Sequence, residues 1–243
     1  MSLIKAIIKV GIPVALTAAA YAVAKTRELT LPSKEKPHSD APIIVALGDS
    51  ITFGAGVVKT RKSDCWEAKL EKLLGGSYQV LNYGISGATL QDEGDKPYWN
   101  MPEKQLQGYP QAALALKPQI ILLMLGTNDS KTFNWNRQEY EKQLETFVKS
   151  YREVNENTQI YLMQPSKCFP KESTGTVAFS IQNEILATEI YDIVQQAGIK
   201  LKVPVIDLYT FTEDHPEWFV DGVHPNAEGN AAIAQYIKSC LKK

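Results

Sequence analysis

The chain has 243 residues, of which 44% are hydrophobic, so it can bury a sizeable core in one large domain or two small ones. Its formal net charge of -1 gives no electrostatic preference for nucleic acids or acidic membranes. The three cysteines (Cys65, Cys168 and Cys240) lie far apart and have no paired spacing with histidine, so neither a zinc site nor a disulfide framework is indicated.

Residues 1–24 differ in composition from the rest of the chain. Lys5 and Lys9 come before an apolar run of the length of a signal-peptide core, and the run ends in a small-x-small pattern at residues 22–24. This segment is predicted to be a cleaved signal peptide or an uncleaved membrane anchor, which would make the protein exported, secreted or membrane-anchored outside the cytoplasm. The alternative is an additional amphipathic helix on a cytoplasmic enzyme.

From Ile43 onward, short apolar runs alternate with longer stretches whose apolar residues have helical spacing. Strands are predicted at 43–49, 78–83, 119–125, 159–164 and 203–208, and helices at 64–74, 103–116, 137–154, 179–198 and 225–241. This alternation implies parallel strands joined by right-handed crossovers. The predicted fold class is α/β, a three-layer α/β/α sandwich around a doubly wound, five-stranded parallel sheet. The domain is expected over 41–243, after a polar, proline-containing linker at 25–40.

The first predicted strand runs directly into Gly48-Asp49-Ser50. A small hydroxyl residue at the carboxyl end of a buried parallel strand lies where such sheets collect ligands, so Ser50 is a candidate nucleophile. The same residues are also common in turns, where Asp49 or Ser50 would only cap the following helix. The choice between these interpretations depends on whether the chain supplies a base for the serine.

Asp221 and His224 are the candidates for that role. Only two other histidines occur, His38 and His215. Asp221 and His224 are three positions apart in a segment that glycine and proline mark as a turn, so the carboxylate can reach the imidazole of its own loop. The pair therefore predicts a general base with its orienting acid, and the alternative is a solvated loop histidine.

The loops that follow parallel strands share one edge of the sheet, so their residues can be considered together. Acyl transfer also needs hydrogen-bond donors for the developing oxyanion, and the candidates are the backbone N–H of Gly87, the side-chain amide of Asn128 and the N–H of Ser50. The alternative is that Gly87 and Asn128 only shape tight turns. Asp49 and Asp129 are expected to bond to backbone amides rather than to take part in chemistry.

Four short motifs occur in the same order as the four blocks of the GDSL, or SGNH, hydrolases, and the chain resembles that family over about residues 43–240. The motifs are Gly48-Asp49-Ser50, Asn82-x-Gly-x-Ser-Gly87, Gly126-Thr127-Asn128-Asp129 and Asp221-x-x-His224. The resemblance implies a flavodoxin-like α/β/α fold and a serine esterase. It also implies Ser50 as nucleophile, His224 and Asp221 as its partners in a catalytic triad, and Ser50, Gly87 and Asn128 as oxyanion donors. The chain lacks the Gly-x-Ser-x-Gly elbow of common α/β-hydrolases.

Aromatic and amide side chains lie in three loops that should border the site, among them Trp99, Trp135 and Trp218. Flat aromatic faces beside amides suit a sugar ring, so these tryptophans are candidate substrate contacts. Within the family, the amino-acid sequence of these motifs resembles that of bacterial carbohydrate O-acetylesterases. This resemblance implies hydrolysis of small acyl esters, acetyl in particular. The alternatives are a lysophospholipase or thioesterase of the same family, with the aromatics serving as packing residues under long loops.

The sequence also allows two hypotheses in which the protein is not an esterase. One is a phosphoacceptor or metal-dependent signalling module that uses Asp49 and Asp129, although only one acid follows the first strand. The other is a non-catalytic exported binding protein. A phosphate-binding loop at 48–56 lacks the required lysine. The expected partner is a small-molecule or carbohydrate ester, with membrane attachment only if residues 1–24 form an anchor; no cofactor, metal or nucleic acid is implied.

Overall fold

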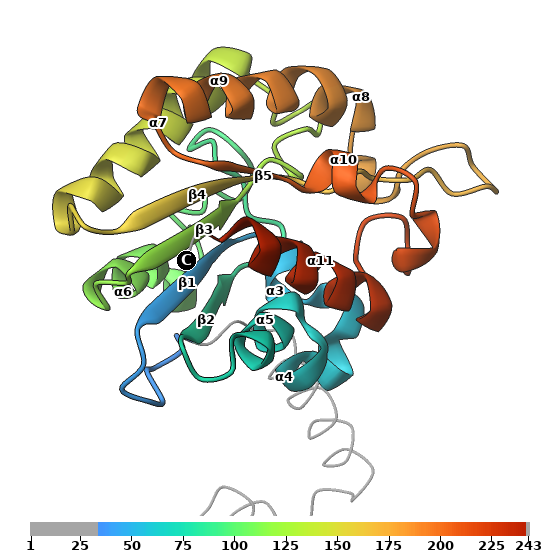
Figure 1. Ribbon diagram of the computed structural model, residues 1–243. Coiled ribbons are helices and arrows are strands. Elements are labelled where there is room, and N and C mark those ends of the chain that lie inside the picture. The colour runs from blue at the N-terminus through green and yellow to red at the C-terminus, as the bar shows by residue number, and fades with distance from the viewer. Residues whose placement is uncertain (1–33, 242–243) are drawn as a thin grey trace, which may run out of the picture. The chain divides into compact units, whose positions relative to one another are not determined.

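The computed structural model describes residues 34–241. Their centre is a sheet of five parallel strands in the order β2-β1-β3-β4-β5, which Figure 1 shows. The strands are β1 (Ile43–Gly48), β2 (Gln79–Gly84), β3 (Ile120–Met124), β4 (Gln159–Gln164) and β5 (Val205–Asp207). Their positions and order confirm the predicted doubly wound, flavodoxin-like α/β class.

Helices cover both faces of this sheet. The longer ones are α5 (Trp66–Leu74), α6 (Tyr109–Ala115), α7 (Arg137–Val154), α9 (Tyr191–Leu201) and α11 (Ala227–Cys240). The shorter ones are α3 (Ser50–Phe53), α4 (Arg61–Asp64), α8 (Asn183–Ile185) and α10 (Leu208–Thr212). Figure 1 shows α7 and α9 over one face and α5 and α11 over the other, so the domain has three layers.

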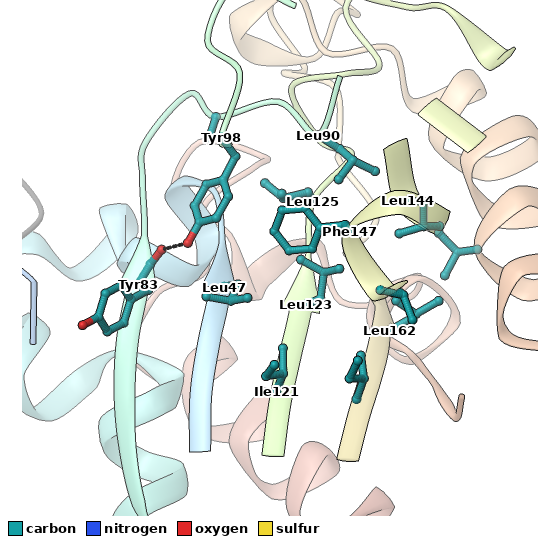
Figure 2. Close-up of a cluster of buried hydrophobic side chains, with 14 of the residues drawn as sticks. Leu47, Tyr83, Leu90, Tyr98, Ile121, Leu123, Leu125, Leu144, Phe147 and Leu162 are labelled. Carbon is teal, nitrogen blue, oxygen red and sulfur yellow. Dashed lines mark hydrogen bonds between the residues drawn. The ribbon is translucent and has the colours of Figure 1, made fainter. Parts of the chain in front are cut away.

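Each strand is buried on both faces. In β1, Val45 and Leu47 pack into the core under α6, α7 and α9, whereas Ile44 and Ala46 pack into the core under α5 and α11. Figure 2 shows the first of these cores, where Phe147 of α7 lies close to side chains of the central strands. Because both faces are covered, the strands read as continuous apolar runs instead of alternating ones.

One predicted helix is broken. The prediction of a helix over 103–116 is wrong in its first half, because the structure has one 3₁₀ turn, η2 (Lys104–Leu106), and then begins α6 at Tyr109. Gly108 adopts a left-handed conformation, with φ of 69°, and Pro110 follows in the first turn of α6. Proline fits the first turn of a helix but cannot continue one from before, which explains why the helix restarts here.

A second predicted helix starts later than expected. Apolar spacing predicted a helix from 179, but Phe179 and Ser180 have φ of 59° and 61°, and the helical stretch begins with α8 at Asn183. The short turn η3 (Ala178–Ser180) precedes it. Gln182 donates its N–H to Ser130 Oγ at 3.2 Å, so a contact with the loop after β3 replaces local helix formation.

Residues 35–41, part of the linker predicted for 25–40, are mostly exposed, but several of them bond to β2. Tyr83 donates its hydroxyl to the carbonyl of Glu35 at 2.9 Å, and Gln79 Nε2 donates to the carbonyls of Ser39 and Ala41 at 2.9 and 2.6 Å. Burial raises the pKa of the Glu35 carboxyl. The polar composition predicted the exposure of this segment but gave no indication of its contacts with β2.

The N–H groups of β2 that point away from β1 all donate to side-chain oxygens. Val80 N–H donates to Glu71 Oε2 at 2.6 Å, Asn82 N–H donates to Glu35 Oε2 at 2.7 Å, and Gly84 N–H donates to Asn82 Oδ1 at 3.0 Å. The intervening residues use their N–H groups toward β1, as Gln79 does with the carbonyl of Pro42. The edge strand β2 thus has hydrogen-bond acceptors for its backbone N–H groups on both sides.

The predicted signal peptide or anchor at 1–24 lies outside the described residues. Within residues 34–241, no helix combines the length and the apolar character needed to cross a membrane. Export and membrane attachment therefore remain predictions from the sequence.

The close approach of β2 to α3 predicts a strong effect of Gly84→Ala. A Cβ at Gly84 would lie 2.2 Å from the backbone nitrogen of Phe53, so α3 would have to move. We expect this substitution to lower the free energy of unfolding by about 2–3 kcal/mol, as overpacking does. The measurement is urea denaturation followed by circular dichroism.

Gly76→Ala is the matched control for this substitution. No atom lies within 4 Å of its Cβ position, and only its positive φ of 85° opposes a side chain. Its expected cost is about 1 kcal/mol, from backbone strain alone. Equal losses for the two variants would contradict the close contact between Gly84 and α3.

Candidate active site

Ser50 lies at the junction of β1 and α3. Asp49 is the N-cap of this helix, and its Oδ1 accepts the N–H of Ile51 at 2.9 Å. Gly54 ends the helix, with its N–H directed to the carbonyls of Ser50 and Ile51. Ser50 is only 7% exposed, so its hydroxyl is held at the carboxyl edge of the sheet by a short, tightly capped turn.

The loop before α11 is shaped by Asp221. Its Oδ1 accepts the N–H groups of Val223 and His224 at 3.0 and 2.8 Å, which is the geometry of an aspartate turn. Its Oδ2 lies 2.7 Å from His224 Nδ1. One carboxylate therefore both folds the loop and orients the imidazole, as the spacing of three residues predicted.

The structure brings this loop to the candidate nucleophile. His224 Nε2 lies 2.8 Å from Ser50 Oγ. Both nitrogens of the imidazole thus have partners, with the carboxylate of Asp221 on one side and the hydroxyl of Ser50 on the other. This is the geometry that a serine nucleophile, its general base and an orienting acid require.

The protonation state of Asp221 follows from its contacts. Partial burial raises the pKa of this carboxyl, but hydrogen bonds from the His224 side chain and from the N–H groups of His224 and Val223 outweigh burial and lower the pKa to about 2. The carboxylate is ionised at neutral pH and can only accept. The proton between Asp221 and His224 therefore resides on Nδ1, which leaves Nε2 free to accept the proton of Ser50.

A buried asparagine fixes the loop of His224 to the rest of the domain. Asn230 of α11 is 1% exposed, and its Oδ1 accepts the N–H of Trp66, the first residue of α5, at 2.9 Å. Its Nδ2 donates to the carbonyls of Pro225 and Asn226, both at 2.9 Å. Asn230 could not be recognised from the sequence, because its role depends on two helices meeting in space.

The three candidate oxyanion donors lie on loops at the same edge of the sheet. Gly87 has φ of 84°, and its N–H has no acceptor among the described residues. Ser50 is the first residue of α3, where an N–H has no partner within the helix. Asn128 uses one hydrogen of Nδ2 toward the carbonyl of Ala88 at 3.1 Å, which leaves the other hydrogen to donate.

The two other acids at this edge serve the loops. Asp129 is fully buried and accepts from the N–H groups of Leu90 and Gln91, each at 2.9 Å, while Asp49 caps α3. Burial raises the pKa of both carboxyls, that of Asp129 to about 6 against the opposing effect of its hydrogen bonds. These contacts confirm the prediction that both acids bond to backbone amides. Within the described part of the chain, no group of three or more His, Cys, Asp or Glu residues could hold a metal ion.

The three candidate tryptophans make the contacts of packing residues. Trp99 packs edge-on against Phe147 and Tyr151 of α7, with ring centroids 5.1 and 5.9 Å apart. Trp135 packs on the buried Tyr140, and Trp218 stacks flat on His215 at 3.7 Å. Each of the three indole rings thus packs against another side chain of the protein. These contacts do not support the prediction that the tryptophans bind substrate.

A different aromatic residue lies beside the candidate base. Phe179, in the loop after β4, meets the imidazole of His224 edge-on at a centroid distance of 5.3 Å, and it is 58% exposed. Phe179 was predicted to begin a helix, so its position beside His224 was not expected. The available signal was an isolated aromatic residue at the end of a polar loop that follows a parallel strand.

Comparisons with known proteins give a family match and a sequence relative. Residues 46–232 match the model of the GDSL-like Lipase/Acylhydrolase family. The chain is 30% identical to an acetylxylan esterase of Xylanibacter ruminicola, in an alignment that covers 87% of this chain and 45% of that protein. The chain thus spans about half the length of this relative.

Solved structures show the same fold. An acetyl xylan esterase superimposes with a TM-score of 0.62 and 19% identity over 82% of this chain and 100% of that chain. An aryl esterase of M. smegmatis superimposes with a TM-score of 0.60 and 21% identity over 83% of this chain and 100% of that chain.

The lowered pKa of Asp221 predicts a stability difference that depends on pH. The folded-state pKa of about 2 lies below the ordinary value of 3.8, so the ionised carboxylate stabilises the folded state above about pH 4. That contribution is lost as the pH falls toward 2. Urea unfolding of the wild type and of Asp221→Asn should show a difference in free energy that shrinks as the pH falls from about 4 toward 2. A difference that stays constant down to pH 2 would contradict the ionised pair.

Proposed function

The chain belongs to the GDSL-like lipase/acylhydrolase family, and from this premise we propose that it is a serine esterase that removes small acyl groups, acetyl in particular, from a carbohydrate. The observation that carries the proposal is the series of hydrogen bonds from Asp221 through His224 to Ser50, at 2.7 and 2.8 Å. In this proposal Ser50 is the nucleophile, His224 the general base and acid, and Asp221 the residue that orients the imidazole.

Acylation begins when Ser50 Oγ attacks the carbonyl carbon of the ester and its proton passes to His224 Nε2. The carbonyl oxygen becomes an oxyanion, and the N–H groups of Ser50 and Gly87 and the amide of Asn128 donate to it. The tetrahedral intermediate collapses as His224 returns the proton to the departing alkoxide. The alcohol leaves, and the acyl group remains on Ser50 as an ester.

Deacylation repeats these steps with water. His224 Nε2 takes a proton from the water molecule that attacks the acyl-Ser50 carbonyl, and the same donors stabilise the second oxyanion. Collapse of the intermediate returns the proton to Ser50 Oγ and releases the carboxylic acid. Asp221 stays ionised throughout, which its pKa of about 2 supports.

The choice of an acetyl ester on a sugar rests on the sequence relative. An acetylxylan esterase is 30% identical over most of this chain, although this chain covers only 45% of that protein. The resemblance of the motif sequences to those of carbohydrate O-acetylesterases also favours an acetylated sugar as substrate. We therefore propose acetyl groups on xylan-type sugars as the substrate class, with longer acyl chains as the alternative that the assay must exclude.

The proposal predicts that hydrolysis depends on Ser50. We expect wild-type enzyme to hydrolyse p-nitrophenyl acetate faster than p-nitrophenyl octanoate, and to release acetate from acetylated xylan. Ser50→Ala should lower kcat by about 10⁴-fold or more on each, because the attacking hydroxyl is gone. Release favouring octanoate would leave the mechanism in place and move the substrate to lipids or thioesters. Equal rates for wild type and variant would reject the esterase.

Asn128 provides a test of the oxyanion donors. Asn128→Ala should lower kcat by roughly 10²- to 10³-fold with a small change in KM, since its donor acts on charge that develops only in the transition state. Asn136→Ala is the matched control, because Asn136 caps α7 through a bond to Glu139 N–H and its loss should cost about 1 kcal/mol of stability without changing kcat. An unchanged kcat in Asn128→Ala would remove this residue from the oxyanion site.

A further inference from the structure

Exposed apolar side chains gather near the candidate active site. Among the described residues, four large hydrophobic side chains are exposed, and three of them are Phe133 in the loop after β3, Phe179 in the loop after β4, and Val220 next to Asp221. The fourth, Ile199, lies on α9. Exposed aromatic side chains beside a reactive centre indicate a surface that gains burial when a ligand binds.

Phe179 is the member of this group that contacts the candidate base. Its ring lies edge-on to the imidazole of His224 at 5.3 Å, yet 58% of the residue is exposed. Its backbone has φ of 59°, and Ser180 follows with φ of 61°. Two consecutive non-glycine residues in the left-handed region are strained, and such strain persists only where surrounding contacts hold the segment in place.

Those contacts lie on both sides of Phe179. Earlier in the loop, Phe169 donates its N–H to the carbonyl of Gly222 at 2.8 Å and packs its ring on Phe219 at 5.2 Å. After Phe179, Gln182 N–H donates to Ser130 Oγ at 3.2 Å. The loop is thus attached both to the loop that carries His224 and to the loop that follows β3.

The chemistry decides which part of a substrate Phe179 would meet. His224 must protonate the oxygen of the departing alcohol, so that oxygen has to lie within hydrogen-bond distance of Nε2. The acyl oxygen points instead toward the donors at Gly87 and Asn128. A side chain that touches the imidazole of His224 therefore borders the alcohol side of the ester, not the acyl side.

Resting on the proposed function, we infer that Phe179 is a specificity-determining residue that forms a wall of the leaving-group subsite, and that the enzyme favours acetyl esters of ring-bearing alcohols. The C–H face of a pyranose, like an aryl ring, can pack on the phenyl ring and bury its exposed surface. A short alkyl or vinyl alcohol offers no such face. The selected feature is the ring of the alcohol, irrespective of the acyl group.

The test measures kcat and KM for three acetates that differ in their alcohol: p-nitrophenyl acetate, methyl tri-O-acetyl-xyloside and vinyl acetate. Phe179→Ala should raise KM for the two ring-bearing esters by about tenfold, the size of one aromatic contact. Its kcat/KM for vinyl acetate should stay within about twofold of wild type, which also shows that the variant is folded. Phe179→Tyr, which keeps the ring, should behave as wild type.

Ile199→Ala is the control for loss of an exposed apolar side chain, and we expect wild-type kinetics on all three esters because Ile199 lies on α9. If Phe179→Ala changes all three esters by the same factor, or none of them, the inference is wrong while the esterase stands. If wild type hydrolyses none of the three in a Ser50-dependent manner, the proposed function fails, and the subsite falls with it.

Discussion

The hydrogen bond between Ser50 and His224 joins residues 174 positions apart, and every other feature of the site depends on holding that distance at 2.8 Å. Neither residue lies on a long element, so rigidity must come from their supports. Asp49 caps the turn of Ser50, and Asp221 folds the loop of His224 around its own carboxylate. Asn230 then links that loop to the start of α5, so the packing of two helices on one face of the sheet sets the reactive distance.

Three carboxyls at one edge of the sheet behave differently because their surroundings differ. Asp221 has an imidazole and two N–H groups as partners, and its pKa falls to about 2. Asp129 accepts backbone hydrogen bonds, but burial outweighs them and raises its pKa to about 6. Asp49 is likewise raised by burial. Only the carboxyl beside the histidine is held firmly in its charged form, which is the form that orienting an imidazole requires.

Much of the fold and of the candidate site could be predicted from the sequence, because both depend on patterns within short segments. Continuous apolar runs identified the strands, and the turn residues around Ser50 and His224 identified the loops that meet. The helix predicted over 103–116 was wrong in its first half, although Gly108 and Pro110 were local signals of the break before α6. What local pattern could not show was contact between distant segments. In the sequence, nothing distinguishes Asn230 from other polar residues of a helix.

The same limit applies to the aromatic residues of the loops. Indole rings in loops suggested substrate contacts, yet Trp99 finds its partners on α7, a helix far along the chain. Phe179 has apolar spacing that continues into a helix, and only its attachment to neighbouring loops turns its ring toward His224. Spacing predicts which face a residue occupies within an element, but a loop has no such periodicity.

The side-chain acceptors along β2 have a consequence for how the molecule behaves toward copies of itself. A strand at the end of a sheet normally offers unpaired N–H groups to any extended segment that approaches, and this is a common start of aggregation. Here Glu71, Glu35 and Asn82 already occupy those donors. An incoming strand would have to displace two carboxylates before it could form a ladder. Glu35 and Glu71 thus protect the β2 edge of the sheet from pairing with a strand of another chain.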